Sequence, residues 1–331
     1  MAQLTVFGAG AMGTALAMHS ARRGVETAIW ATPHDEIAFD AMRSAGRHPN
    51  LREHLPAGVQ VFASGELDDA SAGCEIAVMA AHAAGARSLA RMAKAATAGT
   101  RVVVSVAKGL EPESRSRPSE VYEEELPGAK IIAVGGPCLA PELAEGQPTV
   151  AVWGSVSPDP VGFAADLLDD PAYRILPTDD VIGLEYCAVT KNVAAIGLGV
   201  LDGIGKPTGE EFRNAKAALF SIGVRELVTL VVALGGRQET ALGPAGLGDV
   251  LVTSLGGRNR LYGELVGEGA SPKAALAEMN GRGMTVEGVE SARHVRDLAS
   301  DLGLELPYHF AVESILFEGG DPRTLLEELN K

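Results

Sequence analysis

The segment Leu4-Thr-Val-Phe-Gly-Ala-Gly-Ala-Met-Gly13 decides the fold, because it joins a short apolar run to glycines spaced as G-x-G-x-x-G. The apolar run has the length of a buried strand. Residues 14–23 then predict a helix that ends at Gly24, and residues 25–30 predict a second strand. Strand, glycine turn, helix and strand in this order predict a dinucleotide-binding βαβ unit.

The three glycines have different roles in such a unit. Gly8 permits the tight turn, Gly10 lets the backbone approach a pyrophosphate, and Gly13 lets the helix pack closely on the strand. Ala11 and Met12 lie within the glycine turn just before the helix, whose N-terminus offers free N–H groups to phosphate. We therefore expect these five residues to bind the cofactor.

The end of the second predicted strand bears on the choice of cofactor. NAD-selective sites usually carry an acid about 20 residues past the glycines, which binds the ribose. Trp30, Ala31 and Thr32 occupy this place, and Asp35 comes late enough to be expected as a helix-capping or surface residue. A site without the acid admits a 2′-phosphate, although no arginine follows the strand. We expect NADP or NAD, with NADPH favoured, and include Trp30 and Thr32 in the cofactor site.

Further βα units follow up to about residue 180. Apolar strands are expected at 59–62, 75–81, 101–106, 130–134 and 149–153. Five or six strands with interleaved helices predict a doubly wound, Rossmann-like α/β sheet. Lys108 and Cys138 lie just past strand ends, at the edge where such sheets bind ligands. Position alone leaves Lys108 open as a solvated loop charge or a ligand-binding group, and His82 is expected to be a wall or solvent residue.

Helical segments replace the strands from about Gly183. They are expected at Gly183–Gly203, Glu210–Leu234, Gly263–Asn280, Glu287–Leu302 and Tyr308–Glu318. We therefore expect two domains, with residues 1–180 binding NAD(P) and residues 181–331 forming an all-helical domain for substrate binding and catalysis.

The first of these helices is apolar on every face, which indicates burial, yet Lys191 and Asn192 lie side by side in its middle. Burying an ammonium without a partner costs several kcal/mol. Lys191 either extends along its stem to reach water or works at a site. The helix by itself leaves both possibilities open.

A second unusual segment is Gly246–Ser254, in which Asp249 and Thr253 are spaced to share one face of a helix. Gly248 before the acid also fits a helix start, with Asp249 as a plain N-cap. The run Gly256-Gly-Arg-Asn-Arg260 follows. Guanidinium groups and N–H groups of a glycine turn suit a dianion. The alternative is a surface basic patch, which is less favoured in so acidic a chain.

Composition excludes several classes of function. With 331 residues, 46% hydrophobic and 21% charged, the chain is expected to fold as a globular protein. Its net charge of −15 disfavours nucleic acids and anionic membranes as partners. Three scattered cysteines fit neither a disulfide framework nor a metal site and indicate a reducing, cytoplasmic compartment. We expect no signal peptide and no membrane insertion.

Taken together, the motifs resemble those of the bacterial NAD(P)-dependent glycerol-3-phosphate dehydrogenases, from Thr5 to about Phe317. They are G-A-G-x-x-G-T-A-L-A from residue 8, A-K-G-L-E at 107–111, G-P at 136–137, K-N at 191–192, G-L-G-D-x-x-x-T at 246–253, R-N at 258–259 and V-E-G at 286–288. The resemblance implies a helical domain like the C-terminal one of 6-phosphogluconate dehydrogenase. It also implies a homodimer that transfers hydride reversibly between NAD(P)H and dihydroxyacetone phosphate, a small phosphorylated three-carbon substrate, and feeds glycerophospholipid synthesis.

The resemblance further implies a role for each residue of the site. Lys191 matches the lysine that protonates the C2 oxygen, and Asp249 is close enough to tune it. Substrate contacts are implied for Lys108, Gly136, Cys138, Asn192, Asp249, Thr253, Gly257, Arg258 and Asn259, the last two at the phosphate. Further cofactor contacts are implied for Lys108, Ala140, Arg258 and Glu287.

Three departures from the family pattern bear on the substrate. Cys138 stands where the family usually has Ser or Thr, Gly257 where it has Ser, and Met79-Ala80-Ala81 where it commonly has Val-Pro-Ser. Each could weaken phosphate affinity or shift the substrate. One alternative is therefore a related two-domain dehydrogenase for another small phosphorylated or hydroxy-acid substrate, or for a nucleotide sugar if Cys138 or Cys187 is a nucleophile. The other is a non-catalytic NAD(P)-binding sensor.

Overall fold

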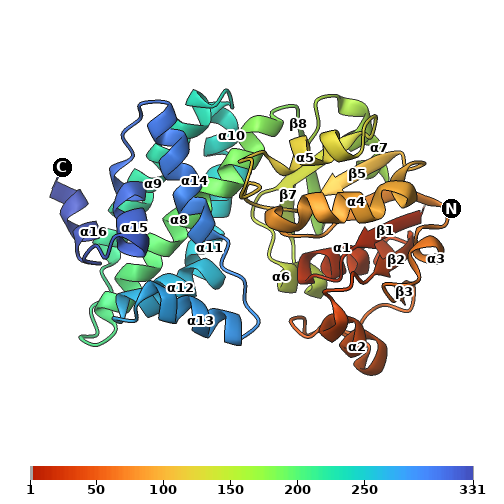
Figure 1. Cartoon of the computed structure of the whole chain (residues 1–331), viewed down its shortest axis with the longest axis horizontal. Coiled ribbons are helices and arrows are strands. Elements are labelled where there is room, and N and C mark those ends of the chain that lie inside the picture. The colour runs from red at the N-terminus through yellow and green to blue at the C-terminus, as the bar shows by residue number, and fades with distance from the viewer. Residues whose placement is uncertain (1–2, 331) are drawn as a thin grey trace. The chain divides into compact units, whose positions relative to one another are not determined.

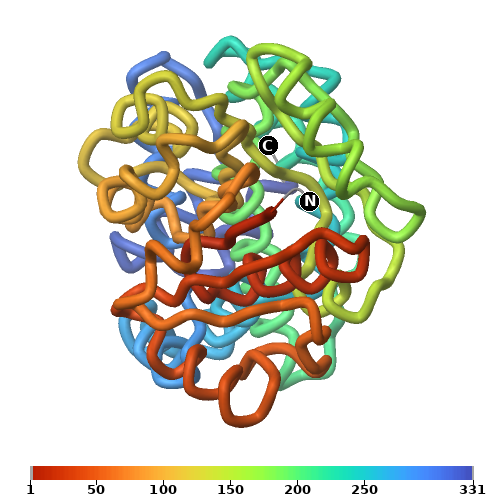
Figure 2. The backbone as a smooth tube through the Cα atoms, turned by 90° about the vertical axis from the view of Figure 1, so that its right-hand side faces the viewer, coloured from red at the N-terminus to blue at the C-terminus, as the bar shows by residue number. Residues whose placement is uncertain are grey.

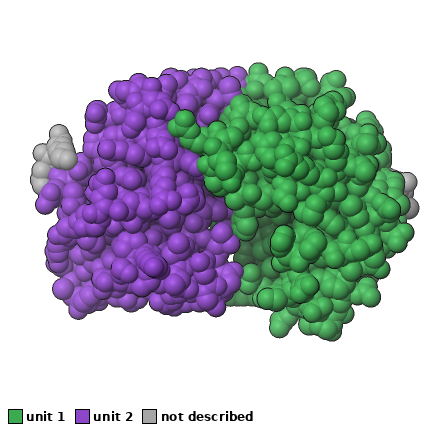
Figure 3. Space-filling view, viewed as in Figure 1, with its two compact units in different colours: residues 1–181 green, residues 182–331 purple. Residues whose placement is uncertain are grey.

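The structure is a computed structural model that describes residues 3–330 (Figure 1). The chain divides into two compact units, residues 1–181 and 182–331, coloured green and purple in Figure 3. The first unit contains the sheet, and every regular element described in the second is a helix. The expected fold class, a Rossmann-like α/β sheet followed by a helical domain, is confirmed.

The sheet of the first unit has eight strands in the order β3-β2-β1-β4-β5-β6-β7-β8. They are β1 Gln3–Phe7, β2 Glu26–Trp30, β3 Val59–Phe62, β4 Cys74–Met79, β5 Val102–Ser105, β6 Ile131–Gly135, β7 Thr149–Gly154 and β8 Tyr173–Thr178. All neighbours are parallel except β6 and β7. The order reverses between β1 and β4, and such a switch point is where doubly wound sheets bind ligands.

Helices cover both faces of this sheet. They are α1 Ala11–Arg22, α2 Glu36–Ala45, α3 Leu67–Ser71, α4 Ala86–Thr97, α5 Pro118–Glu125, α6 Ala140–Glu145 and α7 Pro158–Leu168, with a 3-10 turn, η1, at Ala83–Gly85. Helix α1 lies against β1 and β2, as the red part of the backbone trace in Figure 2 shows. One apolar cluster joins the strands to α1, α6 and α7, and another joins them to α3, α4 and α5.

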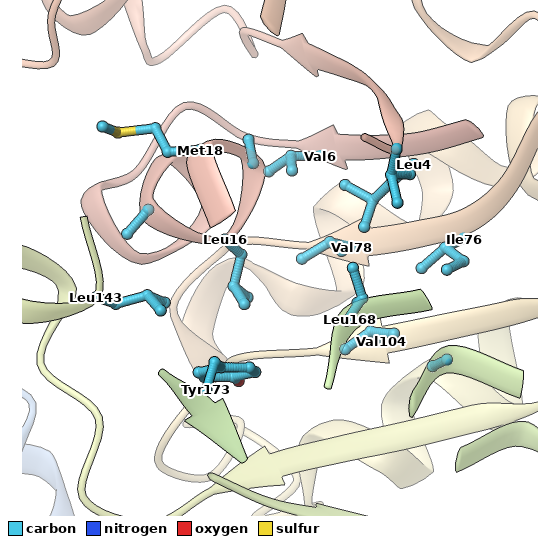
Figure 4. Close-up of a cluster of buried hydrophobic side chains, with 14 of the residues drawn as sticks. Leu4, Val6, Leu16, Met18, Ile76, Val78, Val104, Leu143, Leu168 and Tyr173 are labelled. Atoms are coloured by element: carbon cyan, nitrogen blue, oxygen red, sulfur yellow. The ribbon is translucent and has the colours of Figure 1, made fainter. Parts of the chain in front are cut away.

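Alternation along the strands produces these two clusters. Leu4 and Val6 belong to the first and Phe7 to the second, because successive side chains of a strand point to opposite faces. Figure 4 shows the first cluster, in which strand residues Leu4, Val6, Ile76, Val78 and Val104 meet Leu16, Met18, Leu143, Leu168 and Tyr173. The core thus fixes β1 and β4 side by side, with the glycine turn at their ends.

The second unit is built from helices α8 Val181–Gly205, α9 Arg213–Ala233, α10 Gln238–Leu242, α11 Asp249–Leu255, α12 Arg258–Gly267, α13 Pro272–Gly281, α14 Gly288–Asp301, α15 Pro307–Phe317 and α16 Thr324–Glu327. A π-helical turn, η2, spans Pro244–Gly248, and a 3-10 turn, η3, spans Glu328–Asn330. Helix α8 is long and apolar enough to cross a membrane, but its most apolar window is 94% buried. It is therefore a core helix of this unit.

Glycines explain how α8 and α12 pack. A Cβ at Gly199 would lie 2.1 Å from the carbonyl oxygen of Arg260, and one at Gly263 would lie 2.1 Å from that of Ile196. Gly203 and Gly267 repeat this close approach one turn further along. Small residues four apart on each helix therefore let the two backbones touch, which aligns the first turn of α12 with the middle of α8.

Two expectations about the elements are wrong. The sheet has eight strands, and β8 was not predicted. It is an edge strand that contains Pro177 and buries only alternate residues, so its sequence gives a weak strand signal. The single helix expected over Gly263–Asn280 is two helices, because Ser271 caps α13 and Pro272 begins it. Serine followed by proline is an ordinary helix start.

Candidate active site

The glycine turn of the first unit lies between β1 and α1. Gly8 has φ +103°, and a Cβ there would lie 2.8 Å from the carbonyl oxygen of Ala80, which follows β4. A Cβ at Gly13 would lie 2.5 Å from the Cβ of Ala80 and 2.7 Å from the Cγ1 of Val6. The turn therefore requires glycine at both positions, the first for its backbone angle and the second for contact between α1 and the sheet.

The start of α1 fits a pyrophosphate. Gly10 is the N-cap and supplies no side-chain capping bond, and the first turn contains no acidic residue. The N–H groups of Ala11 and Met12 therefore point out of the helix end, where its dipole favours an anion. The residues of this turn fit the dinucleotide that the sequence predicts.

The end of β2 differs from expectation. The Asp35 side chain makes no helix-capping bond and is half-buried. Its Oδ2 atom instead accepts hydrogen bonds from the backbone N–H of Ala9 at 3.2 Å and from the N–H and hydroxyl of Thr32 at 2.9 and 2.6 Å. Asp35 does occupy the N-cap position of α2, as expected, but its carboxylate joins the end of β2 to the glycine turn instead of capping the helix. Trp30 is buried, and its Nε1–H donates to Ser64.

Lys108 connects two loops at the strand ends of the first unit. It is half-buried, and its Nζ donates to the carbonyl oxygen of Gly136 at 3.3 Å. The Lys108 loop continues to Glu111, whose carboxylate receives both Nε and Nη2 of Arg87 at 2.6 and 2.8 Å. This bidentate contact holds the pKa of Glu111 below its usual value. Neither Arg87 nor Glu111 was among the residues predicted for the site.

The remaining candidates of the first unit lie near these loops. The backbone N–H of Cys138 donates to Gly136, while the Cys138 thiol packs in the apolar cluster of α1, α6 and α7. Ala140 begins α6. His82 is exposed and precedes η1. All three cysteines lie within the described residues, and none of them forms a disulfide.

The second unit brings Lys191 together with the acid and hydroxyl of α11. Lys191 Nζ donates to Asp249 Oδ1 at 2.5 Å and to Thr253 Oγ1 at 3.1 Å. All three residues are buried, with Lys191 5% and Asp249 1% exposed. The lysine therefore does not reach bulk water along its stem. Asp249 does not cap α11, because the π-helical turn η2 leads into that helix and aims the carboxylate at α8.

Two asparagines form a second buried contact one residue further along α8. Asn259 Nδ2 donates to Asn192 Oδ1 at 2.8 Å, and Asn259 Oδ1 accepts from the backbone N–H of Gly288 at 3.0 Å. A Cβ at Gly288 would lie 2.8 Å from that same oxygen, so a side chain there would displace the Asn259 amide. Asn259 thus links α8, α12 and the start of α14. Its hydrogen bond with the backbone of Gly288 was not predicted from the sequence.

The start of α12 resembles an anion site. Gly257 is the N-cap at φ +105°, and neither a capping side chain nor a first-turn acid occurs. Arg258 begins the helix and is exposed. Serine at position 257 would be strained at this angle, which accounts for the glycine. Glu287 is half-buried and precedes α14. Among residues 3–330 no group of His, Cys, Asp and Glu could hold a metal ion.

Comparison with known proteins then decides the family. The model of the NAD-dependent glycerol-3-phosphate dehydrogenase N-terminus matches residues 3–159, and that of the C-terminus matches residues 180–327. The chain belongs to this family. It is therefore an NAD(P)-dependent oxidoreductase, with NAD or NADP as its cofactor, and the resemblance inferred from the motifs is confirmed.

Individual relatives cover nearly the whole chain. An NAD(P)+ glycerol-3-phosphate dehydrogenase of Salinibacter ruber is 36% identical over 98% of this chain and 93% of its own length. One from Chlorobium limicola is 37% identical over 96% of this chain and 93% of its own. A glycerol-3-phosphate dehydrogenase structure from Coxiella burnetii has a TM-score of 0.88 at 30% identity, covering 100% and 99% of the two chains. The structure of a ketopantoate reductase from Ralstonia eutropha has a TM-score of 0.59 at 17% identity, a similarity that shows the fold alone.

Proposed function

We propose that this member of the family reduces dihydroxyacetone phosphate to sn-glycerol 3-phosphate, reversibly, with NADH or NADPH. The observation that carries the proposal is the buried Lys191 ammonium, held by Asp249 and Thr253. A buried cation needs a task or a partner. Here the partner orients the amine and balances its charge, while the amine keeps a proton that it can deliver.

The bound nicotinamide would supply hydride to C2 of the ketone. As negative charge develops on the C2 oxygen, Lys191 donates its proton there, and in the reverse direction it removes the proton of the C2 hydroxyl. Asp249 holds the ammonium in place through the 2.5 Å contact, and Thr253 supports it from the next turn of α11. Because both partners are fixed before the substrate binds, the site needs little rearrangement during the reaction.

We assign the phosphate of the substrate to the start of α12. The exposed Arg258 guanidinium and the uncapped N–H groups after Gly257 together offer a charged fork and a helix dipole. Asn259 serves mainly to hold Asn192, whose remaining amide capacity faces the substrate in this proposal. Phosphate contacts distant from C2 would supply binding energy that a neutral ketone lacks.

The other proposed contacts complete the site. Lys108, the Gly136 carbonyl and the backbone at Cys138 are proposed to meet the substrate. The cofactor is proposed to contact Gly8, Gly10, Ala11, Met12, Gly13, Trp30, Thr32, Lys108, Ala140, Arg258 and Glu287. Residues 1–180 would thus bind the cofactor, and residues 181–331 the substrate.

Substrate trials test this assignment. Purified protein should oxidise NADH or NADPH when dihydroxyacetone phosphate is added, and dihydroxyacetone without the phosphate should react far more slowly. 2-Ketopantoate is the second comparison, because ketopantoate reductase shares the fold. Faster turnover of 2-ketopantoate than of dihydroxyacetone phosphate would contradict the proposal.

We further propose that the product feeds glycerophospholipid synthesis in the cytoplasm and that the enzyme is a homodimer. The family supports these assignments. Light scattering on the purified protein would give the mass of the assembly directly, and a mass close to the 34.2 kDa of one chain would contradict the dimer.

A further inference from the structure

The carboxylate of Asp35 has one oxygen committed to the protein and one available. Oδ2 accepts from Ala9 and from both donors of Thr32. Among residues 3–330, no hydrogen bond or ion pair reaches Oδ1. The side chain is thus fixed in orientation by one oxygen while the other can still accept a hydrogen bond.

The donors define where this carboxylate lies. Ala9 is the residue between the first two glycines of the turn, and Thr32 lies just past the end of β2. In a dinucleotide-binding unit, an acid at this corner binds the ribose of the adenosine half. Asp35 therefore occupies the place of the missing strand-end acid, although it follows the strand by several residues.

We propose that Asp35 accepts a hydrogen bond from the adenosine ribose and excludes a 2′-phosphate, so that the enzyme prefers NADH to NADPH. The inference rests on the proposed function only in requiring a dinucleotide at the Gly8 turn. It reverses the preference for NADPH expected from Ala31 and Thr32 alone.

Surrounding charges favour the same conclusion. A 2′-phosphate would place a charge of about −2 next to the carboxylate, which repels it. One basic side chain close to this corner is His48, which is buried and contacts the Ala9 backbone. Burial lowers the pKa of His48, which disfavours the charged imidazolium that could compensate a phosphate. Arg43 and Arg47 are exposed, and neither pairs with Asp35 in the described part of the chain.

Nucleotide binding without substrate tests the proposal. Titrations of the purified protein with NADH and NADPH, followed by nucleotide fluorescence, should give a Kd for NADPH at least about tenfold higher, from charge repulsion. Asp35→Asn keeps an acceptor for Ala9 and removes the charge, so it should bring the two Kd values within about threefold. AMP and adenosine 2′,5′-bisphosphate, which differ only in the 2′-phosphate, should follow the same ratios, which assigns the effect to the adenosine end.

The neighbouring Glu36→Gln is the matched control, because Glu36 is exposed and its loss changes net charge equally. It should leave the ratio as in the wild type, and thermal melting should show that both variants are folded. Equal affinity of the wild type for the two nucleotides, or an unchanged ratio in Asp35→Asn, would overturn the proposal. Nucleotide binding with the predicted ratios but no reduction of dihydroxyacetone phosphate would instead refute the proposed substrate. Failure to bind any nucleotide would refute both.

Discussion

Lys191 Nζ lies 2.5 Å from Asp249 Oδ1, across 58 residues of chain, and both side chains are almost wholly buried. Taking two charges out of water is costly, and their attraction offsets that cost only while both are present. The pair is therefore better explained by the chemistry it can perform than by a contribution to stability.

Removing one member of this pair should destabilise the protein. Asp249→Ala leaves the Lys191 ammonium buried without its main partner, which typically costs about 3–5 kcal/mol. The double variant Lys191→Met with Asp249→Ala should lose less than Asp249→Ala alone. Urea unfolding measures these changes, with the exposed Asp297→Ala as control. A double variant as unstable as the sum of the single ones would show that the two groups are not coupled.

Arg258 should control affinity for the substrate phosphate. A hydrogen bond to a charged group is worth about 1.5–3 kcal/mol, so Arg258→Ala should raise KM for dihydroxyacetone phosphate about ten- to a hundredfold. The value of kcat should change less, because Arg258 is proposed to act away from C2. Arg282→Ala, which removes an exposed arginine directly after α13, is the control. If both variants keep the wild-type KM, the phosphate binds elsewhere.

Arg87 should hold the Lys108 loop through Glu111. Arg87 also bonds Glu124 and Glu125, and with Arg91 it lowers the pKa of Glu125 to about 2. A carboxylate with a lowered folded-state pKa adds stability that is present above its unfolded pKa of about 4.3 and is lost as pH falls towards the folded value. Arg87→Ala should therefore lower stability at pH 7 and flatten its fall between pH 5 and about 2.

The same variant should raise KM for dihydroxyacetone phosphate severalfold, because the loop that carries Lys108 loses its anchor. Arg101→Ala, which removes an arginine from a loose surface ion pair in the same unit, is the control. An unchanged KM in Arg87→Ala would mean that the loop is held in other ways.

The contact of α8 with α12 should not tolerate an added methyl group. Gly263→Ala would place its Cβ 2.1 Å from the Ile196 carbonyl oxygen, so the helices must move apart. We expect a loss of at least about 2 kcal/mol, typical of overpacking, together with a lower kcat as Asn259 shifts. Gly162→Ala, in α7 with nothing within 4 Å, should instead be neutral or stabilising by about 0.4–1 kcal/mol. Similar melting curves for the two variants would contradict this account.

Much of the fold was predictable, because its signals are local. The G-x-G-x-x-G turn, its flanking strands and the apolar α8 each appear within a short window of sequence. β8 was missed because an exposed edge strand with a proline gives a weak pattern. The break between α12 and α13 was readable from Ser271-Pro272 and was overlooked.

The site was less accessible to pattern reasoning. Periodicity could place Lys191 in a buried helix, but its partner depends on the π-helical turn before Asp249, which no sequence period predicts. Only the family resemblance suggested that pair. The helix-start position of Asp35 was predictable, but the contact of its side chain with the glycine turn is a tertiary contact that strand-end counting does not reveal.

The most direct test of the catalytic assignment is the turnover of Lys191→Ala at saturating dihydroxyacetone phosphate, with NADH binding measured on the same protein. Lys273→Ala, which removes an exposed lysine from α13, is the matched control. We predict that Lys191→Ala loses at least about a hundredfold in kcat while NADH binds as in the wild type and the control is unaffected. A kcat within about twofold of the wild type would contradict the assignment of Lys191 as the proton donor.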